Sequence, residues 1–297
     1  MSKIFEQIVE KRGLDQGFLH PRYEDLADPL ILPGMSEAVA RIKQATKEKE
    51  KILIYGDYDA DGVTASTLME QALKLAGAKP DDIKIMLPDR FADGYGMSPR
   101  MVKVAEKWGA GLVITVDCGS RNHAIVDELN TLGIDCIITD HHETDSELPE
   151  AVAVINPKRK DAPTDALNNL AGVGVAFKLA QALVREGLIE AGQEKWMLDL
   201  VLIGTICDSM LLTGENRIFC HFGMIVLAKT RRIGLRELMR RAGVKNLHSE
   251  AIGFQIGPRI NAAGRLQSAE LSLNLLRSES APEAALLAVE LEELHFR

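Results

Sequence analysis

The chain has 297 residues, of which 46% are hydrophobic, so it can bury one large core or two modest ones. Its formal net charge of −8 at pH 7 excludes a surface that is basic all over, although it allows a local basic groove. The sequence has no apolar stretch of the roughly 20 residues that a membrane span needs, no apolar signal-peptide core and no C-x-x-C pair. We therefore expect a cytoplasmic protein with no membrane partner, no zinc knuckle and no disulfide framework.

The predicted elements begin with a leader over residues 1–48. Prolines interrupt its early part, and an amphipathic helix is predicted over 35–47. We expect this leader to pack on the core of the protein.

From residue 51 the pattern alternates between strands and helices. Short apolar runs predict strands at 51–54, 83–87, 112–116, 136–139 and 151–155. Helical spacing of apolar residues predicts helices near 63–78, 99–108, 123–132 and 175–186. Strands that alternate with helices of this length indicate an α/β fold with a doubly wound, mainly parallel sheet.

Beyond about residue 195 the pattern becomes almost wholly helical. We place a soft domain boundary near residue 210. It divides an α/β domain over 49–210 from a helical region over 211–297.

Three carboxylates crowd the turn after the first predicted strand. Asp57, Asp59 and Asp61 lie at the carboxyl end of that strand, where open parallel sheets bind ligands. Carboxylates this close repel one another unless a cation lies between them. An acidic surface turn is the alternative, since Asp and Gly are common in turns. An EF-hand loop is excluded, because Leu68 stands where that loop needs Glu and because a strand precedes the turn.

Acidic residues also follow three later apolar runs. Asp117, Asp140 and Asp208 each end such a run, which we interpret as three acidic strand ends, and His141 and His142 follow directly after Asp140. A single Asp of this kind is more often a helix cap, but the recurrence along one chain favours a site. Carboxylates with imidazole suit Mn²⁺ and tolerate Mg²⁺, and the absence of thiolate disfavours structural zinc. Two such ions bridged by a shared carboxylate would form a clamp for in-line attack on phosphorus.

In this order, these motifs resemble the DHH phosphoesterase superfamily. Five longer strings resemble its RecJ-type single-strand-specific exonucleases: G-D-Y-D-A-D-G at 56–62, D-G-Y-G at 93–96, I-N-P at 155–157, L-A-G-V-G-V-A at 170–176 and G-P-R-I-N-A-A-G-R-L at 257–266. The resemblance implies a core that hydrolyses single-stranded DNA in the 5′→3′ direction with two Mn²⁺ or Mg²⁺ ions, in recombination and repair. A single-strand-binding protein or a helicase is the candidate protein partner. Family members continue into a DHHA1 domain and an OB-fold, and we expect both to be absent from this chain.

The resemblance implies six metal ligands, which are Asp57, Asp59, Asp61, Asp117, His141 and Asp208. Asp59 would ligate the first ion, Asp61 the second, and Asp117 would bridge both. His141 and Asp208 would complete the second site, and the remaining aspartate would complete the first.

The same resemblance implies roles in the reaction for Asp117, Asp140 and His142. His142 would bind the scissile phosphate or protonate the leaving oxygen. Asp140 would orient a histidine imidazole. Asp117 would hold the two ions on either side of the attacking water.

Two segments are candidates for holding the substrate. Arg259, Asn261 and Arg265 lie in a Gly-rich segment suited to backbone phosphates, although arginines of a loop that cap helices are the alternative. Gly172 and Gly174 open a predicted helix, so phosphate contact at its N-terminus or close packing on the sheet would each explain them.

A basic stretch is as compatible with a solvated helix face as with a surface that follows a nucleic-acid strand. Its cations are Lys229, Arg231, Arg232, Arg236, Arg240, Arg241 and Lys245.

Two other functions stay open. A DHH nanoRNase or nucleotide phosphatase usually carries H-x-x-P-D-G-D-A, whereas this chain has G-D-Y-D-A-D-G. A non-catalytic DHH scaffold has typically lost metal ligands, whereas this chain fills every expected position.

Overall fold

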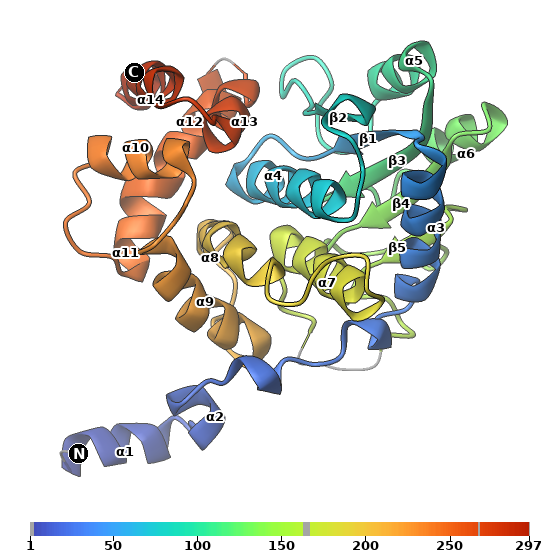
Figure 1. The fold of residues 1–297 in the computed structure, drawn as a ribbon. Helices are drawn as coiled ribbons and strands as arrows, with labels where there is room; N and C mark the ends of the chain where they lie inside the picture. The colour runs from blue at the N-terminus through green and yellow to red at the C-terminus, as the bar shows by residue number, and fades with distance from the viewer. Residues whose placement is uncertain (1–2, 163–166, 267, 297) are drawn as a thin grey trace.

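The computed structural model describes residues 3–162, 167–266 and 268–296. Within these residues, a five-stranded parallel sheet forms the centre of the molecule, with the strand order β2-β1-β3-β4-β5 (Figure 1). The strands are β1 (Lys51–Tyr55), β2 (Ile83–Met86), β3 (Ala110–Val116), β4 (Asp135–Thr139) and β5 (Ala153–Ile155). In β3 and β4 the side chains on both faces of the strand are buried, which explains why these strands are continuous apolar runs in the sequence.

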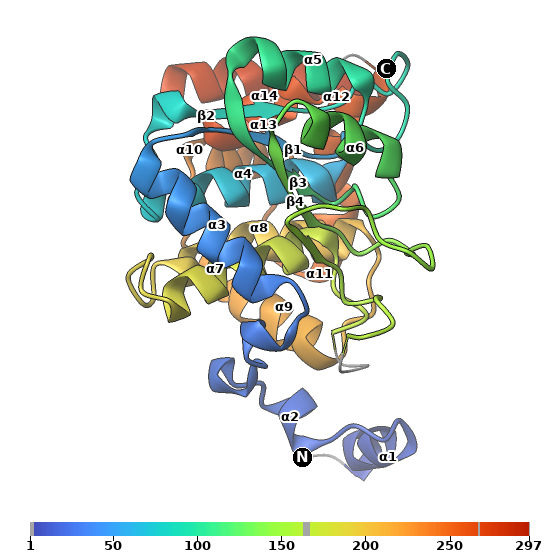
Figure 2. The same ribbon diagram turned by 90° about the vertical axis from the view of Figure 1, so that its right-hand side faces the viewer.

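Helices cover both faces of the sheet (Figures 1 and 2). One face carries α5 (Pro99–Trp108) and α6 (His123–Thr131), and the other carries α3 (Met35–Glu48), α4 (Ala60–Leu75) and α7 (Gly172–Arg185). Nearly all of α4 is buried, because it lies between the sheet and a further layer of helices. The predicted α/β fold with a doubly wound, mainly parallel sheet is therefore confirmed.

The further layer is wholly helical. Helix α8 (Leu198–Cys207) packs against α4, α7 and α9 (Gly214–Leu227). Next follow α10 (Ile233–Arg241) and α11 (Ser249–Ala251), which continues through a π-helical turn (Ile252–Ile256) into α12 (Gly257–Leu266). The last two helices are α13 (Glu270–Arg277) and α14 (Ala281–His295). The domain boundary near residue 210 stays a prediction.

The leader contributes helices and short 3-10 turns. Helix α3 packs on α7 and β5, whereas α1 (Lys3–Lys11) lies away from the other layers in both views (Figures 1 and 2). The remaining short elements are α2 (Gln16–Leu19), η1 (Tyr23–Asp25), η2 (Pro29–Ile31), η3 (Pro80–Asp82) and η4 (Glu194–Met197). Across the described ranges, none of the helices is long and apolar enough to cross a membrane.

The prediction of a strand before Asp208 is wrong. Residues 198–207 form helix α8, and Asp208 is its C-cap residue. Side chains around most of this helix are buried, so its sequence is apolar without a helical stripe. A short apolar run of this kind does not distinguish a buried strand from a buried helix.

A buried ion pair ties the leader to two helices. Lys178 of α7 is fully buried, and its Nζ lies 3.0 Å from Oε2 of Glu215 on α9. Lys178 also donates a hydrogen bond of 2.7 Å to the carbonyl oxygen of Ala27, whose amide donates to Glu215 Oε1 at 2.6 Å. Each charge therefore depends on the other and on the backbone of the leader.

We expect Glu215→Ala to lower the free energy of unfolding by about 3–5 kcal/mol, because it leaves the Lys178 ammonium buried without its partner. The double variant Lys178→Met/Glu215→Leu should recover part of this loss, because it removes both charges. Urea unfolding measures both. Glu143→Ala is the control, since Glu143 pairs with Lys158 through a side chain that is 81% exposed. A midpoint for Glu215→Ala equal to that of the control would contradict the prediction.

Candidate metal centre

The candidate site lies where the winding of the sheet reverses. From β1 the chain passes through α4 to β2 at one side, and then through α5 to β3 on the other side of β1. The loops that leave the carboxyl ends of β1 and β3 therefore separate, and such a point is where open α/β sheets bind ligands. The aspartates predicted from the first two motifs follow these two strands.

The turn after β1 folds around its own carboxylates. Asp59 is the N-cap of α4, and its Oδ1 accepts hydrogen bonds from the amides of Asp61 and Gly62 at 2.9 and 3.1 Å. Asp57 is buried and accepts from the amide of Tyr58 at 2.7 Å. A Cβ at Gly62 would lie 2.5 Å from the backbone of Asp57, so the tight turn requires glycine there.

Asp61 occupies the N-terminus of α7. Its two carboxylate oxygens accept hydrogen bonds from the amides of Gly172 and Val173 at 2.6 and 2.9 Å. The N-terminus of a helix favours a negative charge, so α7 stabilises this buried carboxylate. The amide of Gly172 therefore serves Asp61, and the side of Gly172 faces Asp117, where a Cβ would lie 2.4 Å from Oδ1.

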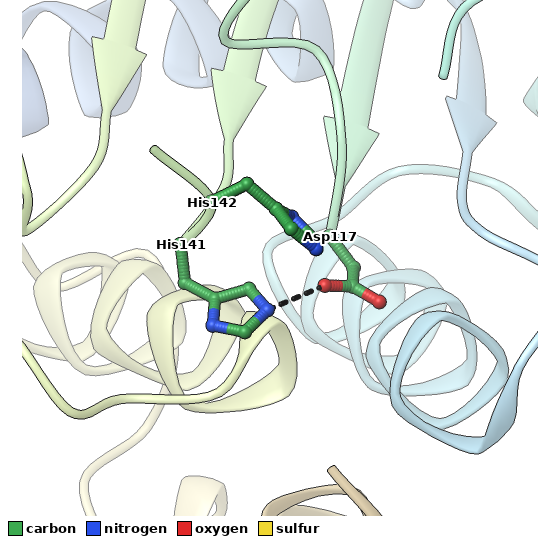
Figure 3. Close-up of side chains that lie close together, drawn as sticks. All are labelled: Asp117, His141 and His142. Carbon is green, nitrogen blue, oxygen red and sulfur yellow. Dashed lines mark ion pairs between the residues drawn. The ribbon is translucent and has the colours of Figure 1, made fainter. Parts of the chain in front are cut away.

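Asp117 follows β3 in an unusual backbone conformation. Its φ of 62° lies in the left-handed region, which is uncommon for residues other than glycine and is found disproportionately at functional sites. Its buried Oδ1 has no hydrogen-bond partner and lies 3.1 Å from Nε2 of His141. Figure 3 shows His141 pointing at this oxygen and His142 lying beside it. An unpartnered buried carboxylate oxygen beside an imidazole nitrogen is the arrangement that a cation would satisfy.

His141 also faces the C-terminus of α8. Its Nε2 lies 3.8 Å from Oδ2 of Asp61 and 3.6 Å from Oδ2 of Asp208. Asp208 reaches the site from the end of a helix, and the next residue, Ser209, has a left-handed φ of 57°.

The potential ligand atoms form three overlapping sets, each within 4.8 Å. The sets are Asp57 with Asp59 and Asp117, Asp61 with His141 and Asp208, and Asp117 with His141 and His142. The fold thus brings all six predicted ligands close together, in groups that agree with the division that the resemblance implies, and Asp117 lies close to both groups. Ligation itself stays a prediction.

Burial and mutual repulsion dominate the electrostatics of the carboxylates. Burial and the neighbouring Asp59 raise the pKa of Asp57 to about 7 and that of Asp208 to about 6. Burial and nearby carboxylates also raise the pKa values of Asp61 and Asp117 well above the usual range. Such groups are poorly accommodated as anions unless a cation compensates them.

The donor set fits Mn²⁺ or Mg²⁺. Burial lowers the pKa of His141 to about 4, so its imidazole is neutral and free to act as a ligand. Burial raises the pKa of the Cys207 thiol to about 12 and that of Cys118 well above its usual range, so both neighbouring thiols are protonated. Carboxylate oxygens with one or two imidazoles are suitable ligands for these two ions.

Asp140 and His142 form a hydrogen-bonded pair beside the ligand sets. Asp140 Oδ1 lies 2.8 Å from His142 Nδ1 and also accepts from the amide of His141 at 2.7 Å. Its Oδ2 accepts from the amide of Ser120 at 2.9 Å. Burial acts to raise the pKa of Asp140, but the hydrogen bonds from His142 and Ser120 outweigh it and hold this pKa below its usual range. For His142, burial acts to lower the pKa, and the bond to Asp140 outweighs it and raises the pKa.

The predicted substrate segment is helix α12, not a loop. Arg259 is buried, forms an ion pair with Glu292 of α14 at 2.5 Å and donates to the carbonyl oxygen of Gln255 at 2.7 Å. Asn261 Oδ1 accepts from the amide of Ala60 at 2.7 Å, at the start of α4. Arg259 and Asn261 therefore hold helices together, and among the three predicted residues only Arg265 is exposed.

The other candidate substrate contacts are also engaged within the fold. A Cβ at Gly174 would contact Leu170 and Phe219 at ordinary distances of 3.4 and 3.8 Å, and the residue is buried. In the basic stretch, Arg232 pairs with Asp199, Arg240 pairs with Glu237, and Arg231 stacks on Trp196. These contacts favour close packing for Gly174 and a partly neutralised helix face for the arginines.

Two residues near the site received no role from the sequence. Tyr95 Oη lies 2.8 Å from His142 Nδ1. Asn156 donates to Ser120 Oγ at 2.8 Å and to the carbonyl oxygen of His142 at 2.9 Å. Both belong to strings that carried the resemblance, D-G-Y-G and I-N-P, and those strings were the only signal that could have identified them.

Comparison with known families agrees with the geometry. A family model described as "DHH family, N-terminal domain" matches residues 51–205. The chain is 41% identical over 302 residues to the single-stranded-DNA-specific exonuclease RecJ of Bacillus subtilis (strain 168), which covers 99% of this chain and 37% of that protein. It is 38% identical over 283 residues to RecJ of Thermus thermophilus, which covers 93% of this chain and 40% of that protein. The chain thus spans less than half of the length of either relative.

Solved structures give the same relationship. A crystal structure of exonuclease RecJ bound to manganese has a TM-score of 0.82 and 34% identity, and covers 90% of this chain and 66% of that chain. RecJ of Thermus thermophilus in complex with Mn²⁺ has a TM-score of 0.83 and 32% identity, and covers 97% of this chain and 41% of that chain.

We expect Gly172→Ala to weaken Mn²⁺ binding at least about 10-fold, because the new Cβ would displace Asp117, whose Oδ1 would lie 2.4 Å away. Gly174→Ala is the matched control, since its Cβ would make only ordinary contacts in the same turn of α7. Titration calorimetry with Mn²⁺ measures both affinities, and circular dichroism checks that both variants are folded. Equal affinities would contradict the predicted position of Asp117 beside the ion.

The metal-free chain should lose stability as the pH rises from 6.5 to 8. Burial and the neighbouring Asp59 raise the pKa of Asp57 from 3.8 to about 7, so the folded state binds more protons than the unfolded state between these two pH values. The last part of the resulting loss of stability falls between pH 6.5 and 8, where this carboxyl finishes ionising in the folded state. Asp57 alone then contributes a loss of about 1 kcal/mol in the free energy of unfolding. Burial of neutral His141 acts in the opposite direction.

Asp57→Asn separates these two effects, because His141 is common to both proteins. Its unfolding free energy, measured by urea denaturation across the same pH range, should decline less than that of the wild type. Parallel curves for the two proteins would show that Asp57 does not titrate in this range.

Proposed function

Because the chain belongs to the DHH family, we propose that it is the core of a Mn²⁺- or Mg²⁺-dependent exonuclease that hydrolyses single-stranded DNA in the 5′→3′ direction. The observation that carries the proposal is a pair of ligand sets at the reversal point of the sheet. Asp117 belongs to the first set, and its Oδ1 lies 3.1 Å from Nε2 of His141 in the second. The names of the relatives, single-stranded-DNA-specific exonucleases with 38% and 41% identity, support the choice of substrate. The titles of the matched structures support the choice of metal.

Six residues would hold the ions in this proposal. Asp57 and Asp59 would serve the first position, and Asp61, His141 and Asp208 the second, with Asp117 between them. The unpartnered Oδ1 of Asp117 supports this assignment. Two divalent ions in such a site supply activation of a water molecule and neutralisation of charge on the phosphoryl group.

His142 would act directly on the phosphodiester. Asp140 forms a hydrogen bond with Nδ1 of His142, which orients the imidazole ring and leaves Nε2 free to contact the substrate. The raised pKa of His142 favours the protonated form, which can bind the scissile phosphate or give a proton to the leaving oxygen. Asp140 stays ionised, because its pKa is held low, and so keeps the imidazole in place.

The contact with DNA would lie along α12. Arg265 is exposed at the end of that helix and could pair with a backbone phosphate. Arg259 and Asn261 would act indirectly, by fixing α12 against α14 and α4. A role in recombination and repair, a cytoplasmic location, and a single-strand-binding protein or helicase as partner are further parts of the proposal, which follow from the DNA substrate.

Hydrolysis of single-stranded DNA labelled at its 5′ or 3′ end, in the presence of Mn²⁺, tests the proposal. We expect rapid release of the 5′ label and a loss of at least about 100-fold in rate for Asp117→Asn. Asparagine has the same shape as aspartate and tolerates the left-handed backbone of this position. Asp161→Asn, which changes a surface carboxylate paired with Arg159, should retain the wild-type rate.

Two outcomes would overturn the proposal. Cleavage of a short RNA oligomer without cleavage of DNA would indicate a nanoRNase. Mn²⁺ binding by calorimetry without cleavage of either substrate would indicate a DHH scaffold that binds metal and lacks the activity in this chain.

A further inference from the structure

The loop between β2 and α5 contains the D-G-Y-G string at 93–96, to which the proposed mechanism assigns no role. Asp93 forms an ion pair with Arg100 of α5 at 2.5 Å, which fixes one side of the loop. The carbonyl oxygen of Gly96 accepts a hydrogen bond from the hydroxyl of Tyr55 at 3.1 Å, which fixes the other side. Tyr95 lies between these two anchors.

Two glycines shape the loop around Tyr95. Gly94 and Gly96 have φ values of +76° and +85°, which side-chain-bearing residues rarely adopt. A Cβ at Gly96 would also lie 2.8 Å from Oδ1 of Asn122. The chain thus turns sharply before and after Tyr95, and this fixes the direction of its side chain.

The hydroxyl of Tyr95 meets the same nitrogen that Asp140 holds. Tyr95 Oη and Asp140 Oδ1 each lie 2.8 Å from His142 Nδ1. The two rings meet edge to face, with centroids 5.2 Å apart and an interplanar angle of 66°.

His142 Nδ1 can form hydrogen bonds with both Asp140 and Tyr95 only in some protonation states. The ionised carboxylate of Asp140 carries no hydrogen and can only accept, and it already accepts from the amides of Ser120 and His141. Nδ1 must therefore carry a hydrogen, which it shares between Asp140 Oδ1 and the phenol oxygen. Two acceptors on different groups define the plane of the imidazole as well as its tautomer, whereas one acceptor would leave the ring free to rotate about a single bond.

We propose that Tyr95 is a positioning residue for His142, which fixes the imidazole plane so that Nε2 faces the ligand set of Asp117 and His141. In Figure 3 the His142 ring lies next to Asp117. One nitrogen of His141, one nitrogen of His142 and one oxygen of Asp117 all lie within 4.8 Å of one another. The side chain of His142 is 42% exposed, so it lacks the tight packing that would otherwise hold its plane. The catalytic consequence rests on the proposed function, since it needs His142 to act on the phosphodiester.

The kinetic test is Tyr95→Phe in the full chain, with 5′-labelled single-stranded DNA and Mn²⁺. Phenylalanine keeps the ring contact and removes only the hydroxyl. We expect kcat to fall about 10-fold, with KM and the Mn²⁺ affinity unchanged, because an outer partner of an active-site histidine is lost. Tyr23→Phe is the control, since it removes a hydroxyl bonded to Glu194 in another part of the fold and should leave kcat unchanged.

A double-mutant cycle shows whether Tyr95 acts through His142. In a His142→Ala background, Tyr95→Phe should have no further effect on kcat. An effect of the same size in both backgrounds would overturn the proposal. A change in KM alone for Tyr95→Phe would also overturn it, because a direct contact between Tyr95 and the DNA would explain that result.

Nitrogen NMR of the metal-free chain gives a readout that needs no activity. The Nδ1 and Nε2 resonances of His142 should differ between Tyr95→Phe and the wild type, and stay unchanged in Tyr23→Phe. Unchanged resonances in Tyr95→Phe would overturn the positioning role. Absence of DNA cleavage by the wild type, by contrast, would overturn the proposed function and leave the NMR result to decide the role of Tyr95.

Discussion

The repulsion among buried carboxylates at the ends of β1 and β3 is the constraint around which this structure is organised. Left alone, such groups would move apart or draw in water. Here backbone amides hold several of these groups in place. Asp59 is bound to the first amides of α4 and Asp61 to those of α7. Asp117 has a left-handed backbone, and its amide donates to the carbonyl oxygen of Thr139 at 2.9 Å. The fold therefore holds in place an arrangement that is unfavourable without a cation.

Three helices have one terminus at this site, and they differ in which terminus it is. Helices α4 and α7 present their N-termini, whose amides bind the side chains of Asp59 and Asp61. A helix N-terminus favours negative charge. Helix α8 presents its C-terminus, where the partial negative charge opposes a carboxylate at Asp208 and favours a cation beside it. The first two helices explain why the carboxylates can be buried, and the third increases the demand for positive charge.

Much of the fold and the site could be predicted because their signals are local. Strands buried on both faces are continuous apolar runs, and Asp117 and the Asp140–His142 segment follow such runs directly. Asp208 does lie near the other candidate ligands, but its element was predicted wrongly, because burial around α8 removes the helical stripe from its sequence. The contacts of Arg259 and Tyr95 could not be predicted, since their partners lie 33 and 47 residues away. Residue type alone does not reveal whether an arginine faces a phosphate or a buried glutamate.

The contact between α12 and the start of α4 bears on how this protein can be divided. The family model ends at residue 205, within α8, yet Asn261 supplies the acceptor for the amide of Ala60. Gly264 packs so closely that a Cβ there would lie 2.4 Å from the carbonyl oxygen of Tyr58, inside the acidic turn. The end of the family model is thus not a boundary of the physical unit. A fragment excised at the end of the matched region would keep five of the six candidate ligands, and it would lose Asp208 together with the wall behind the other aspartates.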